Sequence, residues 1–191
     1  MKYGKCQALP GVIKHKCMID LTQAENQIHN VKNFQHLIST PFQGAINALC
    51  WSRNLIGDFA EIVEKVALDG NMAILDQEEL RELQLSEQGQ LAREVLLNDL
   101  KVLQEHGASP ILNVIKCYER DDVYPSFPTD VYSFHVDRSP IPTETFLCTY
   151  HGKSSEILPN SKATQKILVP KIRAELKKLY GGGEEGFESF L

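Results

Sequence analysis

In its second half the sequence reads Val131-Tyr132-Ser133-Phe134-His135-Val136-Asp137-Arg138. The first six of these residues are rich in β-branched and aromatic types, which predicts a strand. Side chains two positions apart on a strand point to the same face, so we expect His135 and Asp137 to point together. An imidazole and a carboxylate can then share one metal ion, and a second imidazole would complete the facial triad of non-haem iron sites.

The same residues also fit a second interpretation. Asp137-Arg138-Ser139-Pro140 has the composition of a turn, in which aspartate is favoured. In that case His135 is an ordinary histidine and Asp137 caps the turn. The spacing alone does not choose between a metal site and a turn.

Two apolar stretches flank this region. Ile111–Tyr118 is short and β-branched, which predicts a strand buried on both faces, and Thr145–Tyr150 predicts another strand. Loops that contain proline separate the three strands. Such an order is typical of a β sheet or barrel and not of βαβ units.

The sequence before these strands is dominated by helical patterns. Apolar residues recur at helical spacing over 57–68, where Asp58 and Glu61 predict a capping box at the helix start. A longer helical region covers 77–106, with a break expected at Gly89. After the strands, Ala163–Tyr180 predicts a further helix.

These patterns predict an α+β fold, in which N-terminal helices are followed by strands. We expect three regions: a mainly helical part over 1–109, a strand-bearing part over 110–160 that carries the His-x-Asp motif, and a C-terminal helix and tail over 161–191. The last region ends on an apolar tail, so it is expected to be incomplete.

Residues from Ile111 to Asn160 resemble the opening strands of the double-stranded β-helix in Fe(II)- and 2-oxoglutarate-dependent dioxygenases. More narrowly, Phe134–Asp137, Leu147–Gly152 and Ile157–Pro159 are similar to the bacterial domain of unknown function 1826 family, which is uncharacterised. The resemblance implies part of a cupin-like jelly-roll sheet. It also implies an Fe(II) ion held by His135 and Asp137, 2-oxoglutarate as cosubstrate, and oxidation of a substrate that the sequence does not identify.

The sequence departs from the dioxygenase pattern after Asp137. The pattern needs a second histidine on a late strand, but the histidine that follows is His151, which comes too early. Glu144 and Glu156 are further candidate oxygen ligands. We therefore expect the chain to stop before its site is complete and to be inactive by itself. The alternative is a non-catalytic cupin-like module that binds a metal or a partner.

The composition indicates which classes of partner and which cellular compartment to expect. A net charge of −5 and a pI near 5.7 argue against a nucleic-acid partner. No run reaches the roughly 20 apolar residues that a membrane span needs, so no membrane partner is expected. The five cysteines include no Cys-x-x-Cys pair, which favours free thiols in the cytoplasm. Open sheet edges favour a second copy of the chain as partner.

Overall fold

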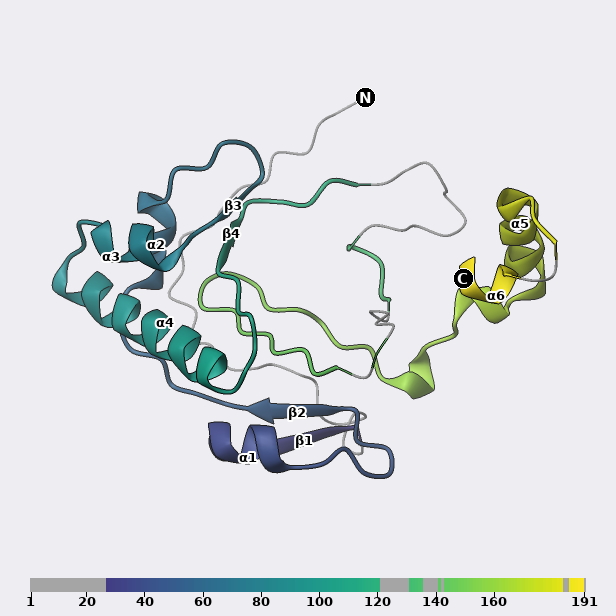
Figure 1. The fold of residues 1–191 in the computed structure, drawn as a ribbon, viewed down its shortest axis with the longest axis horizontal. Coiled ribbons are helices and arrows are strands. Elements are labelled where there is room, and N and C mark those ends of the chain that lie inside the picture. Colours follow the sequence, from purple (N-terminus) through teal and green to yellow (C-terminus); the bar gives the residue numbers. More distant parts are fainter. Residues whose placement is uncertain (1–26, 121–130, 136–140, 142, 184–185, 191) are drawn as a thin grey trace. The chain divides into compact units, whose positions relative to one another are not determined.

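The computed structural model describes residues 27–120, 131–135, 141, 143–183 and 186–190. The chain divides into two compact units, an N-terminal unit Met1–Asn54 and a C-terminal unit Leu55–Leu191, whose elements are drawn in Figure 1. The boundaries expected from the sequence, after residues 109 and 160, stay predictions.

The N-terminal unit contains a small parallel sheet that the sequence did not predict. Its elements are β1 (Ile28–Val31), α1 (Phe34–Ser39) and β2 (Ala48–Trp51). The two strands pair in parallel, with Ile28 opposite Ala48. Helix α1 begins after Asn33, whose side chain accepts a 2.9 Å hydrogen bond from the backbone N–H of His36. Strands of four residues are too short to show clear alternation in the sequence.

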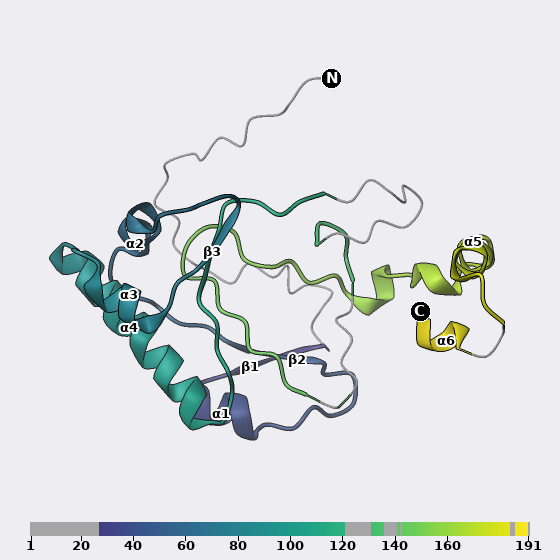
Figure 2. The same ribbon diagram turned by 45° about the horizontal axis from the view of Figure 1, so that its top comes forward.

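The C-terminal unit begins with three helices. They are α2 (Phe59–Lys65), α3 (Gln77–Glu82) and α4 (Glu87–Glu105), and Figures 1 and 2 show α2 and α3 beside α4. Asp58 caps α2 as predicted, because its carboxylate accepts from the backbone N–H groups of Ala60 (3.0 Å) and Glu61 (3.2 Å). Helix α4 ends before Gly107 (φ 88°), which confirms the predicted stop.

The reciprocal half of the predicted capping box is replaced by a long-range contact. The carboxylate of Glu61 accepts from the backbone N–H (2.9 Å) and the hydroxyl (2.6 Å) of Ser86, and the N–H of Asp58 donates to the carbonyl of Gln88 instead (2.8 Å). The Ser86 hydroxyl, followed by the Ser86 N–H, holds the pKa of Glu61 below its ordinary value of 4.5. The contact fixes the start of α4 against α2.

The break in the long helical region lies earlier than predicted. Helix α3 ends at Glu82 and α4 begins at Glu87, whereas we expected the break at Gly89. Ser86 is the N-cap, and its hydroxyl accepts a 3.2 Å hydrogen bond from the N–H of Gly89. Gly89 therefore lies in the first turn of α4, where it is buried and an added Cβ would meet the Glu61 carboxylate.

The first strand predicted in the second half of the sequence belongs to a short antiparallel sheet. It consists of β3 (Met72–Ile74) and β4 (Asn113–Ile115), so the strand expected over Ile111–Tyr118 is confirmed at its centre. Val114 is buried, while Met72 and Ile74 on the other face are exposed. The expectation that both faces are buried was wrong, because in the described residues nothing covers that second face.

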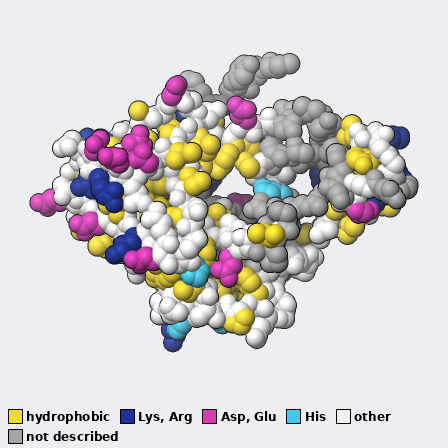
Figure 3. Space-filling view, viewed as in Figure 1, with side chains coloured by type: hydrophobic (Ala, Val, Ile, Leu, Met, Phe, Trp, Pro, Cys, Tyr) yellow, Lys and Arg dark blue, Asp and Glu magenta, His cyan; other side chains and the backbone are white. Residues whose placement is uncertain are grey.

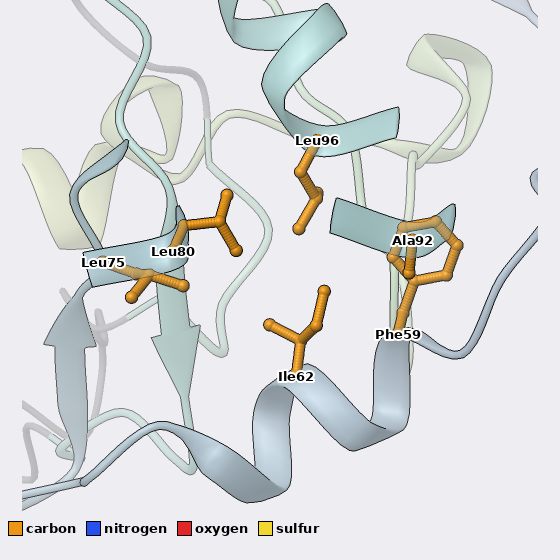
Figure 4. Close-up of a cluster of buried hydrophobic side chains, with 6 residues drawn as sticks. All are labelled: Phe59, Ile62, Leu75, Leu80, Ala92 and Leu96. Atoms are coloured by element: carbon orange, nitrogen blue, oxygen red, sulfur yellow. The ribbon is translucent and has the colours of Figure 1, made fainter. Parts of the chain in front are cut away.

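The core of the C-terminal unit lies where its helices meet. Figure 4 shows side chains from α2, α3 and α4 and from the loop after β3 pointing toward one another. They are Phe59, Ile62, Leu75, Leu80, Ala92 and Leu96. Leu80 is fully buried. Burial of such aliphatic side chains contributes about 1.5–3 kcal/mol each, which makes this cluster the main stabilising feature of the unit.

The C-terminal part of the unit is helical but starts later than predicted. It contains the turns η1 (Asn160–Lys162) and η2 (Lys166–Leu168) and the helices α5 (Pro170–Tyr180) and α6 (Phe187–Phe190). We expected helix from Ala163, but α5 begins at Pro170, which suits a first turn. Figures 1 and 2 show α5 and α6 side by side. The buried ring of Phe187 is tilted against that of Tyr180, with centroids 5.8 Å apart, and the guanidinium of Arg173 lies 5.1 Å from its centre.

The structure confirms the α+β class. The described residues contain helices and two small sheets. Among those residues no helix has the length and apolar character that crossing a membrane requires.

Candidate functional site

His135 lies in a short described segment, 131–135, that does not form the expected strand. Residues 131–133 form a turn, and Phe134 and His135 follow it without a ladder. The hydrogen bonds of Tyr118 explain why the predicted strand does not form. The backbone N–H and C=O of Tyr118, at the end of the preceding strand region, both bond to the side chain of Tyr132 and not to a neighbouring strand.

Tyr132 connects this segment to Tyr118, three positions past the end of β4. Its hydroxyl accepts a hydrogen bond from the N–H of Tyr118 (3.0 Å) and donates one to the carbonyl of the same residue (3.1 Å). The two rings form an edge-to-face pair with centroids 6.3 Å apart, and the guanidinium of Arg120 lies 4.4 Å from the ring centre of Tyr132. The Tyr132 residue is 47% exposed.

The imidazole of His135 is oriented by the backbone carbonyl of Ser133. Its Nδ1 lies 2.7 Å from the carbonyl oxygen of Ser133. A carbonyl has no proton to give, so Nδ1 is the donor, and Nε2 is the nitrogen that carries the lone pair. The side chain is exposed. The orientation suits a metal ligand, because histidines that bind metals usually donate their other ring N–H to a carbonyl or carboxylate.

Asp137, the second predicted ligand, lies outside the described residues, as does Arg138. The structure therefore leaves the pairing of His135 with Asp137 as a prediction. Within the described ranges no three His, Cys, Asp or Glu side chains come together in a group that could hold a metal ion.

The third expected strand has no ladder and contacts α4 and its C-cap through side chains near its two ends. Tyr150 donates a 2.8 Å hydrogen bond to Oδ2 of Asp99, and its ring stacks on that of Phe59 with centroids 5.6 Å apart. Near the other end, Nε2 of His106 lies 3.8 Å from Oε2 of Glu144. Side-chain contacts with the helix thus replace strand pairing. Tyr150 is partly buried and packs against the core cluster.

The remaining candidate ligands do not approach His135 in any recorded contact. Glu144 is the partner of His106, and Glu156 is exposed. His151 is exposed and precedes Gly152, whose φ of 84° requires a turn that glycine adopts most easily. His151 therefore lies beside a bend of the backbone at the protein surface.

The sequence did not predict the hydrogen-bonded residue pairs that hold the candidate site in place. Tyr118 and Tyr132 are 14 residues apart, and Asp99 and Tyr150 are 51 apart. No local spacing links such pairs. The one available signal was the presence of aromatic residues at both ends of the proline-bearing loop.

The chain was compared with protein-family models, curated proteins and solved structures, and none of them matches it.

Proposed function

We propose that this chain binds a divalent metal ion through His135, with Asp137 as the second protein ligand. The observation that carries the proposal is the 2.7 Å hydrogen bond between Nδ1 of His135 and the carbonyl of Ser133. It selects the tautomer in which Nε2 can coordinate a metal, and it restricts rotation of the ring. Exposure of the side chain gives an ion access from solvent.

The motif supports the choice of second ligand. Asp137 follows His135 by two positions, and a carboxylate with an imidazole is the donor set that non-haem Fe(II) accepts. The reaction that the resemblance implies is oxidation of a substrate, in which Fe(II) with 2-oxoglutarate would supply dioxygen activation. The resemblance also implies part of a jelly-roll sheet. Among its three expected strands, β4 is the one with a ladder in the described part of the chain.

The role of this chain's residues in such a reaction is binding and orientation. His135 would hold the ion in a fixed direction set by Ser133, and Tyr132 would hold the segment against the sheet. A further histidine is needed for the full facial triad. We therefore propose metal binding as the activity of this chain and place oxidation second to it.

The test is a titration of the purified chain with Co(II), an oxygen-stable substitute for Fe(II), with and without 2-oxoglutarate. We expect one equivalent to bind, and His135→Ala and Asp137→Ala to weaken binding at least tenfold, since each removes one protein ligand. His29→Ala is the matched control, because His29 is exposed on β1 and outside the motif. Equal binding by all four proteins would refute the site. Tighter binding with 2-oxoglutarate, lost in His135→Ala, would support the oxygenase.

The second candidate function is a non-catalytic module that binds a second copy of the chain. The observation that favours it is the outer face of β3 and β4, where Met72 (51%) and Ile74 (64%) are exposed. Figure 3 shows hydrophobic side chains gathered over these strands. A two-stranded sheet is only marginally stable without a cover, and exposed apolar patches mark interaction sites.

Sedimentation velocity over a range of concentrations tests this second function. A dimer that Ile74→Lys dissociates would support it, with Leu168→Lys as the matched control, because Leu168 is equally exposed but lies in η2. A monomer at every concentration would contradict it.

We also propose a cytoplasmic location. Cys50, Cys117 and Cys148 are not in disulfide bonds in the described part of the chain, and a reducing compartment preserves such thiols. The acidic net charge of −5 supports the expectation that nucleic acid is not the partner.

A further inference from the structure

The contacts around His135 form a continuous series that begins at the small sheet. Asn71, beside β3, accepts hydrogen bonds from the N–H of Lys116 (2.8 Å, to its carbonyl) and from the thiol of Cys117 (3.2 Å, to Oδ1). These bonds fix the two residues that directly follow β4 to Asn71, the residue that precedes β3. The position of Tyr118, the next residue in the chain, is therefore set by the sheet.

The hydroxyl of Tyr132 then links the His-x-Asp motif to Tyr118. A tyrosine hydroxyl has one proton and acceptor lone pairs, so it can accept from the N–H of Tyr118 and donate to its carbonyl at the same time. The pair satisfies both backbone groups, which a neighbouring strand would otherwise have satisfied. It holds Tyr132 at one place beside the sheet, although the residue is largely exposed.

The last step leads from Tyr132 to the imidazole. The carbonyl of Ser133, the residue directly after Tyr132, is the acceptor that orients Nδ1 of His135. His135 lies three positions after Tyr132, a span of about 10 Å when fully extended. A change in the position of residue 132 therefore moves both the imidazole and the carbonyl that orients it.

We infer that Tyr132 is a positioning residue for His135: its hydroxyl, bound to the backbone of Tyr118, fixes the direction and tautomer of the imidazole that binds the metal. This inference rests on the proposed metal site. Loss of an outer-shell partner typically costs 10–100-fold in metal affinity. Because Tyr132 acts through Ser133, we expect the lower end of that range, about tenfold.

Two variants separate the hydroxyl from the ring. Tyr132→Phe removes both hydrogen bonds to Tyr118 but keeps an aromatic ring beside Arg120 and Tyr118. Tyr118→Phe is the matched control, because the Tyr132 hydroxyl contacts the backbone of Tyr118 and the variant keeps that backbone and the ring. A role in packing alone would make the two variants alike.

The experiment measures the tautomer of His135 and the Kd for Co(II) on the full chain. Long-range proton–nitrogen NMR spectra at pH 8, with ¹⁵N-labelled histidine, distinguish a protonated Nδ1 from a protonated Nε2. We expect a protonated Nδ1 in the wild type and in Tyr118→Phe, and mixed tautomers in Tyr132→Phe. The Kd should rise about tenfold in Tyr132→Phe and stay within twofold in Tyr118→Phe.

Different results would overturn the role of Tyr132 and the proposed metal site. A wild-type His135 protonated on Nε2, or a Tyr132→Phe protein with unchanged tautomer and Kd, would overturn the role of Tyr132. Co(II) binding that His135→Ala leaves unchanged would instead overturn the metal site. The wild-type spectrum keeps the test decisive even if Tyr132→Phe fails to fold.

Discussion

The hydroxyl of Tyr150 donates a 2.8 Å hydrogen bond to Oδ2 of Asp99, which lies 51 residues earlier on α4. The contact attaches the extended segment after the His-x-Asp motif to the longest helix of the C-terminal unit. Burial, followed by the negative charges of Cys148 and Asp99, raises the pKa of Tyr150 above its ordinary value of 10.0.

This raised pKa predicts a loss of stability at alkaline pH. A group whose pKa is higher in the folded state stabilises the fold fully below its unfolded pKa, and that contribution disappears as pH rises above about 10. Tyr150→Phe should flatten this alkaline decrease and cost about 1 kcal/mol near neutral pH for the lost hydrogen bond. Circular dichroism during urea unfolding at several pH values measures both. The exposed Tyr118→Phe should keep the wild-type pH dependence; an equally steep decrease in Tyr150→Phe would contradict the account.

The contact between Glu61 and Ser86 predicts the opposite dependence at acid pH. The pKa of Glu61 is lowered, chiefly by the Ser86 hydroxyl, so its contribution is present above the ordinary value of 4.5 and is lost as pH falls below it. Ser86→Ala should weaken the fold by about 1 kcal/mol at neutral pH, because it also removes the N-cap of α4. The same substitution should also reduce the loss of stability as the pH falls. Ser154→Ala, at an exposed loop position, serves as the control, and an unchanged acid limb in Ser86→Ala would be the adverse result.

Leu80 tests where the core lies. Its side chain has 0% exposure between the helices, whereas Leu168 in η2 is 65% exposed. Leu80→Ala should reduce the free energy of unfolding by about 2–5 kcal/mol, because it leaves a cavity, and Leu168→Ala by less than about 0.5 kcal/mol. Thermal and urea unfolding measure the difference. Similar losses in the two variants would place the core elsewhere.

Gly57 tests the close approach of the loop before α2 to α4. Its φ is 103°, and an added Cβ would meet the backbone of Ala92 and Gln88. Gly70 has a similar φ of 98°, but an added Cβ there meets nothing within 4 Å. Gly70→Ala should therefore cost about 1–2 kcal/mol for the backbone conformation alone. Gly57→Ala should cost clearly more, because α4 must also move. Equal losses of stability would show that the loop does not touch the helix.

The helix ends were predictable because their signals are local. Asp58 caps the residues that follow it directly, and Gly107 adopts the positive φ that ends α4. The break before α4 was placed three residues late, since the partner of Ser86 is Glu61, 25 positions away. The sequence carries no periodic signal for such a contact.

The strands were harder to predict than the helices. β4 was found through its β-branched composition, but the short strands β1 and β2 were missed. Residues 131–135 have strand composition, yet Tyr132 supplies the hydrogen bonds that a neighbouring strand would have made to Tyr118. His135 itself was predicted from the motif. Its orientation by Ser133 was not, because composition does not determine rotamers.

The most direct test of the metal site is NMR of the histidine rings during titration with Zn(II). The chain has six histidines. We predict that the first equivalent moves the Nε2 resonance of His135 to the position of a metal-bound nitrogen and leaves His29 and His36 in the N-terminal unit unchanged. If the first equivalent binds while the His135 ring keeps its free resonances, the ion is held elsewhere and the site is refuted.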